Sequence, residues 1–177
     1  TGYAGETRAK IQTLSEISLQ ETPRFTSGFK ELDRVLGGGI VPGSAILIGG
    51  HPGAGKSTLL LQVMCGLARN MTALYVTGEE SLQQVAMRAN RLNLPTDKLN
   101  MLSETSVEQI CNLADQLKPQ IIVVDSIQVM HLSDIQSSPG SVAQVRECAS
   151  FLTRYAKTRQ VAIIMVGPVS YTHLTLP

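Results

Sequence analysis

The chain has 177 residues, of which 43% are hydrophobic and 16% are charged, and its formal net charge at pH 7 is +1. The length fits one domain, and the apolar content excludes a chain that is disordered throughout. The balanced charge excludes a globally basic nucleic-acid-binding protein. Any contact with DNA must therefore come from a local patch or from segments outside this sequence.

The cysteines and the apolar runs bear on where the protein works. Cys65, Cys111 and Cys148 stand far apart in the sequence and match no zinc-ligand spacing, and unpaired cysteines are typical of a reducing compartment. No run approaches the ~18–20 apolar residues of a membrane span, and the N-terminus has no apolar signal core. We therefore expect a cytoplasmic protein without a membrane partner. Because residue 1 is not Met, we also expect the chain to be a piece of a longer protein.

The predicted elements follow one another as alternating strands and helices. Residues 1–24 are mixed and polar and are interpreted as a lead-in segment, and a short helix is predicted at 28–36 before a glycine-rich turn. Beyond this turn, continuous apolar runs predict buried strands, and apolar residues that repeat at three and four predict helices. In chain order these are strand 45–48, helix 56–69, strand 73–77, helix 82–92, a weaker strand 100–102, helix 107–117, strand 120–124, helix 142–156 and strand 161–166.

This order of elements predicts the fold class. Strands that are apolar throughout are typical of a parallel sheet that is covered on both faces. Their alternation with helices predicts an α/β fold, a mostly parallel sheet with helices on both faces, in which ligands bind outside the carboxyl ends of the strands. We predict that this core spans 25–167. Residues 168–177 continue no element and are interpreted as a tail outside the core.

The strongest motif follows the first apolar strand, where the sequence matches the phosphate-loop pattern G-x-x-x-x-G-K-[ST]. Its residues are Gly50, His51, Pro52, Gly53, Ala54, Gly55, Lys56 and Ser57. The glycines let backbone N–H groups face the phosphates, and the positive end of the following helix points at them. Lys56 is predicted to reach the β- and γ-phosphates, Ser57 to bind Mg²⁺, and Thr58 to face the α- or β-phosphate. The competing interpretation is a glycine-rich turn without a ligand.

A second acidic motif ends the most apolar strand of the chain. Residues 121–124 are all β-branched and are followed by Asp125. This pattern is typical of the Walker B strand, whose carboxylate holds the magnesium water shell, usually with the phosphate-loop hydroxyl of Ser57. The alternative is an ordinary strand-end aspartate that caps the next turn. Ser126 either orients an attacking water or a switch loop, or serves as a turn hydroxyl, and the sequence leaves these interpretations open.

Hydrolysis of a nucleotide also needs a group that orients or deprotonates the attacking water. Glu79 and Glu80 follow the strand predicted at 73–77, so they are expected at the same edge of the sheet as the phosphate loop. We predict that Glu79 is the catalytic base and that Glu80 is the second candidate. The alternative is that both carboxylates stabilise the first turn of the next helix through its dipole.

Several strings of residues together resemble the RecA-type ATPase core, and within that superfamily a family of bacterial DNA repair ATPases. The strings are Leu14-Ser15-Glu16-Ile17, Thr26-Ser27-Gly28, Glu31 to Gly39, Pro42-Gly43, the phosphate loop, Tyr75 to Ser81, Val124 to Gln128 and Pro139 to Glu147. The resemblance covers about residues 11–167. The phosphate loop alone indicates only a nucleoside triphosphatase, whereas the other strings are much more specific.

The resemblance implies a RecA-like P-loop fold and ATP hydrolysis coupled to DNA strand exchange and branch migration. It also implies ATP and Mg²⁺ as cofactors, DNA and a recombinase as partners, and homo-oligomeric rings. By residue matching, Lys56 and Ser57 carry the phosphate and magnesium roles, Asp125 the magnesium shell and Glu79 the base. The family's four-cysteine zinc module and C-terminal domain have no counterpart here, and Gly167-Pro168-Val169-Ser170 stands where the family has Gly-His-Val-Thr-Lys.

Other functions remain open on the sequence alone. One is a RecA-superfamily ATPase that acts on a protein partner, and another is a nucleotide-binding fragment without efficient hydrolysis. The loop at 131–141 stands where RecA-like folds place a DNA-facing loop, with basic residues after it. These are Arg146, Arg154, Lys157 and Arg159. The alternative for them is the solvated face of an amphipathic helix.

Overall fold

A five-stranded parallel sheet forms the centre of the structure, a computed structural model that describes residues 9–17, 23–50 and 54–168. The strands are β1 (Ala45–Gly50), β2 (Ala73–Thr77), β3 (Asn100–Ser103), β4 (Ile121–Asp125) and β5 (Ala162–Pro168). They lie in the spatial order β1-β5-β4-β2-β3, and each adjacent pair is parallel. The carboxyl ends of these strands therefore meet at one edge of the sheet, where ligands bind in such folds.

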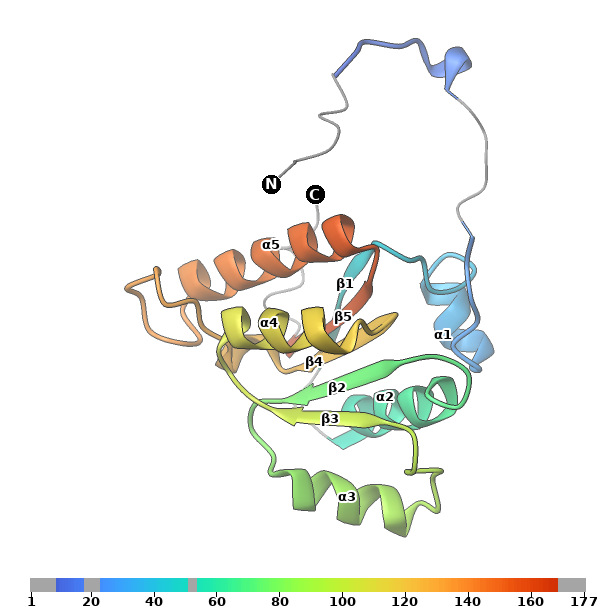
Figure 1. Cartoon of the computed structure of the whole chain (residues 1–177), viewed down its shortest axis with the longest axis vertical. Helices are drawn as coiled ribbons and strands as arrows, with labels where there is room; N and C mark the ends of the chain where they lie inside the picture. The colour runs from blue at the N-terminus through green and yellow to red at the C-terminus, as the bar shows by residue number, and fades with distance from the viewer. Residues whose placement is uncertain (1–8, 18–22, 51–53, 169–177) are drawn as a thin grey trace.

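Helices cover both faces of this sheet (Figure 1). Helices α2 (Ala54–Leu67) and α3 (Leu82–Arg91) pack on one face, and α4 (Val107–Leu117) and α5 (Val142–Arg159) pack on the other. The short helix α1 (Lys30–Val35) precedes β1, and the 3-10 turns η1 (Leu14–Glu16) and η2 (Ile127–Val129) lie before α1 and after β4. The predicted α/β class, with a parallel sheet between two layers of helices, is therefore confirmed.

The core explains why the strands read as continuous apolar runs. In β4, Ile122 and Val124 face α4 and α5, whereas Ile121 and Val123 face α2 and α3. All four side chains are buried, because successive residues of a strand point to opposite faces and both faces are covered. The same alternation places the side chain of Asp125, at the end of β4, on the α2 side of the sheet.

Serine N-caps begin the helices that follow the carboxyl edge of the sheet. The hydroxyls of Ser81, Ser106 and Ser141 accept hydrogen bonds from the backbone N–H groups of Gln84, Gln109 and Gln144, at 3.1, 3.3 and 3.2 Å. A cap of this kind is worth ~1 kcal/mol of stability. The caps hold α3, α4 and α5 at defined starting points.

The segment before β1 folds back on itself through backbone pairing. Phe25 and Ile40 form an antiparallel bridge, and a Cβ at Gly39 would lie 2.8 Å from the Phe25 carbonyl oxygen, so this close approach requires glycine. Asp33 accepts from the N–H and the hydroxyl of Ser27, at 2.8 and 2.6 Å. These contacts give part of the 26–39 segment a structural role, because they fix the turns that precede β1.

The structure also differs from the sequence prediction in detail. The weak strand pattern at 100–102 is a true strand, β3, which pairs with β2 at the edge of the sheet. Helix α2 begins at Ala54, two residues before the predicted start, because the helix includes the end of the glycine-rich motif. The turn η2 had no periodic signal in the sequence. The division into a lead-in segment, a core and a tail stays a prediction.

None of the helices in the described ranges has the length and apolar character needed to cross a membrane.

Candidate nucleotide-binding site

The end of β1 and the start of α2 lie where the sequence predicts the phosphate loop. β1 ends at Gly50, and α2 begins at Ala54 and includes Gly55, Lys56, Ser57 and Thr58. The predicted loop residues His51, Pro52 and Gly53 lie outside the described residues. The first turn of α2 carries no acidic side chain, so nothing within that turn offsets the partial positive charge of the helix N-terminus. This helix end is therefore suited to bind an anion.

Lys56 lies half-buried in this first turn. Burial lowers the pKa of its ammonium group, because desolvation disfavours the charged form. Within the described part of the chain, no carboxylate forms an ion pair with Lys56. An anionic ligand at the N-terminus of α2 would supply a counter-charge for Lys56, which fits the predicted contact with phosphate.

Asp125 lies at the carboxyl end of β4, paired in register with Thr77 of β2 and Val166 of β5. The Tyr75 hydroxyl donates a hydrogen bond of 2.7 Å to its Oδ2. Burial, and next the negative charge of Asp125, raise the pKa of the Tyr75 phenol, so the phenol stays protonated and keeps donating. The peptide bond between Asp125 and Ser126 is cis. The structure thus places the predicted Walker B carboxylate on the α2 face, with one oxygen held by a neighbouring strand.

Glu79 lies just beyond β2, next to the end of β4. The buried hydroxyl of Ser126 donates to Glu79 Oε1 at 3.3 Å, so residues 47 positions apart in sequence meet at the edge of the sheet. The Gly78 N–H donates to the Asp125 carbonyl at 2.9 Å and extends the β2–β4 pairing by one residue. This contact adds a partner that the sequence did not indicate for Ser126, and the interpretations of its hydroxyl stay predictions.

Glu80 has a different environment from its neighbour. Its Oε2 accepts from Arg88 Nη1 at 2.6 Å, and its backbone N–H and C=O both bond to the Thr77 hydroxyl, at 3.2 and 3.0 Å. Arg88 is a largely buried residue of α3, and the ion pair with Glu80 raises the pKa of its guanidinium against the opposing effect of burial. Glu80 therefore belongs to an internal ion pair, whereas the carboxylate of Glu79 is exposed.

The loop at 131–141 is held by side chains from both helices of its face. Gln144 of α5 accepts from the Leu132 N–H at 3.0 Å and donates to the Ser137 carbonyl at 2.8 Å. Glu108 of α4 accepts from both the N–H and the hydroxyl of Ser133, at 2.9 and 2.8 Å. These bonds lower the pKa of Glu108 against the opposing effect of its partial burial. The loop is thus fixed at its start and in its middle.

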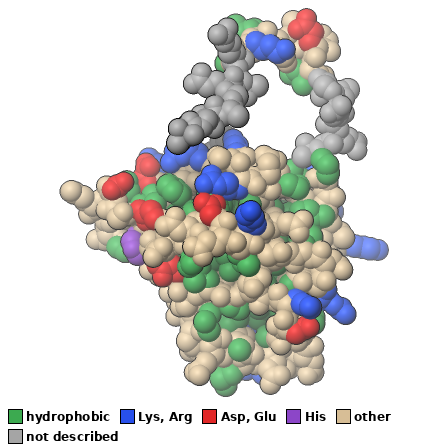
Figure 2. All heavy atoms as spheres, viewed as in Figure 1, with side chains coloured by type: hydrophobic (Ala, Val, Ile, Leu, Met, Phe, Trp, Pro, Cys, Tyr) green, Lys and Arg blue, Asp and Glu red, His purple; other side chains and the backbone are tan. Residues whose placement is uncertain are grey.

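The basic residues after this loop lie on exposed positions of α5. Arg159 forms two bonds of 3.1 Å with Asp115, and its guanidinium lies 4.9 Å from the centre of the Tyr155 ring. Arg154 lies 6.0 Å from the centre of the Phe151 ring. Figure 2 shows basic and acidic side chains interspersed on the face viewed, without a continuous basic patch. Arg159 is therefore best explained by packing within the molecule.

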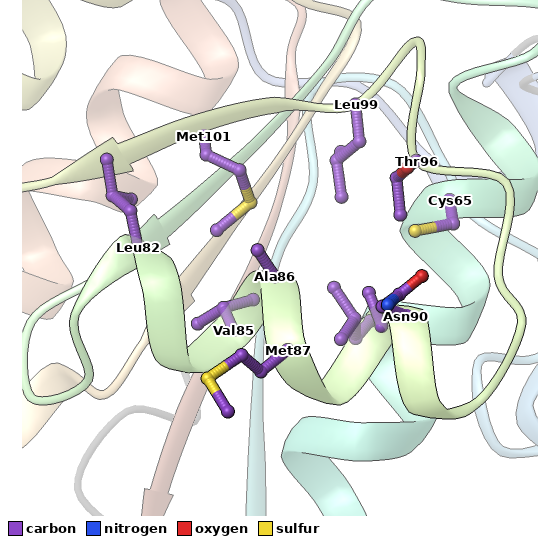
Figure 3. A pocket seen from close by; sticks show the side chains of 11 residues that line it. Cys65, Leu82, Val85, Ala86, Met87, Asn90, Thr96, Leu99 and Met101 are labelled. Atoms are coloured by element: carbon purple, nitrogen blue, oxygen red, sulfur yellow. The ribbon is translucent and has the colours of Figure 1, made fainter.

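An apolar groove of about 440 Å³ lies between α2, α3 and β3 (Figure 3). Its lining includes Leu61, Val85, Met87, Leu99 and Met101, and none of the residues that line it is charged. Without a cation or a free helix N-terminus, the groove offers nothing to bind phosphate. The strand ends therefore stay the candidate nucleotide site.

The donor atoms at the strand ends fit magnesium better than a metal held by protein alone. Across the described ranges, no group of three or more His, Cys, Asp or Glu side chains is placed to hold a metal ion. The candidate donors are the Ser57 hydroxyl and the Asp125 carboxylate. Mg²⁺ typically takes one or two protein oxygens and completes its shell with water and substrate phosphates.

Cys65, Cys111 and Cys148 are buried free thiols, and burial raises the pKa of Cys111 and that of Cys148 to about 12.

The parallel sheet, and the G-x-x-x-x-G-K-[ST] motif between β1 and α2, are typical of the P-loop nucleoside triphosphatase fold. Residues 11–168 match the AAA domain family, and the chain belongs to this family.

The chain is also similar to curated proteins named DNA repair protein RadA. It is 92% identical to that of Haemophilus influenzae over 170 residues, which cover 96% of this chain and 37% of the relative. It is 72% identical to that of Escherichia coli and 59% identical to that of Pseudomonas aeruginosa, again over 96% of this chain and 37% of each relative. The chain thus spans little more than a third of these relatives. The predicted resemblance to bacterial DNA repair ATPases is confirmed.

Sequence reasoning missed two residues of the site, Tyr75 and Arg88. Tyr75 had the signal of a core strand residue, and nothing local indicated that its hydroxyl reaches Asp125, 50 positions away. Arg88 stands near the C-terminal end of α3, where a basic residue is expected from the helix dipole alone. The contact of Tyr75 depends on β2 and β4 being neighbours, whereas that of Arg88 with Glu80 depends on how α3 packs after the turn that follows β2.

Proposed function

We propose that this chain is the ATP-binding and ATP-hydrolysing core of a DNA repair ATPase. The observation that carries the proposal is the meeting of Asp125, Ser126 and Glu79 at the sheet edge from which α2 begins with Lys56 and Ser57. A carboxylate for the metal shell, a carboxylate for water and a helix end for phosphate are the parts that nucleotide hydrolysis requires.

The phosphates of ATP bind at the N-terminus of α2. In this proposal, Lys56 places its ammonium on the β- and γ-phosphates, the backbone N–H groups at the start of α2 face the phosphates, and Thr58 faces the α- or β-phosphate. The ammonium is half-buried and has no carboxylate partner among the residues that the structure describes, which supports this role. Ser57 and Asp125 would hold Mg²⁺, with Asp125 acting through a water molecule. The bound metal would neutralise charge that develops on the phosphate oxygens.

Glu79 orients the attacking water and accepts its proton. Its exposure and its bond from Ser126 support this assignment over Glu80, whose carboxylate is already occupied by Arg88. General-base catalysis of this kind contributes ~10²–10⁴-fold to a rate. Because Ser126 follows Asp125 directly, the water-orienting and metal-binding groups are fixed relative to one another.

The cellular role rests on the relatives. Their name, DNA repair protein, supports DNA as the partner of the whole protein, with stimulation of ATP hydrolysis by single-stranded or branched DNA and branch migration as the coupled process. A recombinase partner, a homo-oligomeric ring and a cytoplasmic location belong to the same proposal. The loop at 131–141 is the candidate DNA contact, with Arg146 in the first part of α5 beside it, since Lys157 lies in the last turn of that helix and Arg159 is engaged with Asp115.

A second candidate is nucleotide binding without efficient turnover. The observation that favours it is the share of the relatives that this chain spans, 37% of their length. A RecA-superfamily ATPase that acts on a protein partner is the alternative to a DNA partner.

The test is ATP turnover and nucleotide binding by this chain, with and without single-stranded DNA, beside a Lys56→Ala variant and a Lys98→Ala control at an exposed loop position. Loss of a charge-assisted bond costs ~1.5–3 kcal/mol, so Lys56→Ala should weaken nucleotide binding ~10- to 150-fold. Equal binding by wild type and Lys56→Ala would refute the nucleotide site. Binding without turnover would select the second candidate, and turnover that DNA leaves unchanged would favour a protein partner.

A further inference from the structure

Tyr75 is a buried polar residue whose hydroxyl reaches the nucleotide site. Its side chain is 0% exposed and packs under α2 with Leu60, Leu61 and Met64. Tyr75 pairs in register with Val123, and Thr77 pairs with Asp125, so Tyr75 and Asp125 point to the same face of adjacent strands. The phenol spans the distance of one pleat and donates to Asp125 Oδ2 at 2.7 Å.

This hydrogen bond limits the orientation of the Asp125 carboxylate. A carboxylate at a strand end has a broad, roughly two-fold torsion about its terminal bond, and a donor that holds Oδ2 selects one orientation. Oδ1 then remains for other partners. The donor comes from a ring that the core fixes, so the orientation does not depend on a mobile side chain.

A second layer supports the phenol. The guanidinium of Arg88 interacts electrostatically with both Tyr75 and Asp125, and Glu80 holds Arg88 at 2.6 Å. Two nitrogens of Arg88, Nε and Nη2, are buried without a hydrogen-bond partner among the described residues. Among the described residues, Arg88 thus bonds to Glu80, and the hydrogen bond to Asp125 comes from the neutral phenol of Tyr75.

We propose that Tyr75 is a positioning residue for the magnesium site, which holds Asp125 so that Oδ1 faces the metal water shell. The inference rests on the proposed function, because it needs Asp125 to serve Mg²⁺. Residues that orient metal ligands from behind typically change metal affinity ~10- to 100-fold when they are substituted. A structural hydrogen bond, by contrast, would affect stability and leave metal dependence unchanged.

The experiment compares Tyr75→Phe with Tyr155→Phe. Tyr155 is also buried, and its hydroxyl donates to Asp115 at 2.6 Å between α4 and α5, so the control removes the same kind of bond away from the site. Binding of a fluorescent N-methylanthraniloyl-ATP is measured in EDTA and across a Mg²⁺ titration, with thermal unfolding of each variant. Both variants should lower the melting temperature. Only Tyr75→Phe should raise the half-maximal Mg²⁺ concentration, by about 10-fold or more, with binding in EDTA unchanged.

A second measurement needs no Tyr75 variant. In protein labelled at tyrosine Cζ with ¹³C, the Tyr75 resonance, assigned by substitution of the other tyrosines, should move when Mg²⁺ is added to the ADP complex, and Tyr155 should not. A wild-type chain that binds nucleotide equally with and without Mg²⁺ overturns the metal site and this inference together. If the wild type responds to Mg²⁺ but Tyr75→Phe leaves the half-maximal Mg²⁺ concentration unchanged, the inference alone is overturned. If Tyr75→Phe does not fold, a Tyr75 resonance that does not move on addition of Mg²⁺ overturns it in the same way.

Discussion

The Gln144→Leu substitution tests how the loop at 131–141 is held. Gln144 is 1% exposed, and its amide accepts from the Leu132 N–H at 3.0 Å and donates to the Ser137 carbonyl at 2.8 Å. Leucine fills a similar volume but leaves both backbone groups without a partner. Each unsatisfied buried group costs ~1–3 kcal/mol. Because Ser137 is only half-buried and water satisfies part of its demand, we expect a loss of ~2–4 kcal/mol in the free energy of unfolding.

Urea unfolding measures this loss, and hydrogen exchange at the Leu132 amide locates it. The matched control is Gln109→Leu, because Gln109 holds the same position after the capping serine of α4 but its side chain is exposed. The control should stay within ~0.5 kcal/mol of wild type. The Leu132 amide should exchange faster in Gln144→Leu only. A loss below ~1 kcal/mol, with unchanged exchange at Leu132, would refute the view that Gln144 holds the loop.

Two further predictions concern the acidic residues. Glu79→Gln should lower kcat for ATP hydrolysis ~10²–10⁴-fold with nucleotide affinity unchanged. Glu80→Gln should mainly lower thermal stability, because it breaks the ion pair with Arg88. If steady-state kinetics show the large loss of kcat in Glu80→Gln instead, the two assignments are exchanged. Bonds from Tyr155 and then Arg159 lower the pKa of Asp115. The stability it contributes is therefore complete above its unfolded pKa of about 3.9 and is lost as pH falls through the lower folded value. Asp115→Asn should be less stable than wild type near pH 7, with a gap that closes below about pH 4 in urea unfolding; a gap independent of pH would refute the role of the charge.

The sequence predicted the elements whose signal is local. The apolar run 121–124 predicted β4, and the carboxylate that follows it predicted Asp125 as a site residue, because a charge directly after a buried strand must lie at the sheet edge. The contact between Tyr75 and Asp125 was beyond this reasoning. It depends on β2 and β4 being neighbours while β5 separates β4 from β1, and strand order is set by packing over the whole chain.

The choice between Glu79 and Glu80 shows the same limit at closer range. The two residues are adjacent and chemically alike, so periodicity could not separate them. The Thr77 hydroxyl bonds both backbone groups of Glu80 and fixes the turn, and Arg88 returns from the second half of α3 to take its carboxylate. The distinction thus arises from a turn and a helix contact that only the folded chain brings together.

Gly78 connects the turn after β2 to the segment after β4. A Cβ at this position would lie 2.5 Å from Val129 Cγ2 and 2.9 Å from Met130 Cε, so the absence of a side chain lets η2 pack against the end of β2. That packing holds the chain that follows Asp125 close to β2, where the Ser126 hydroxyl reaches Glu79. Asp125 and Glu79, the carboxylates proposed for the metal shell and for the attacking water, are therefore held close together by the contacts around Gly78. For this reason we attribute the geometry of the site to the join between two strand ends as much as to the phosphate loop.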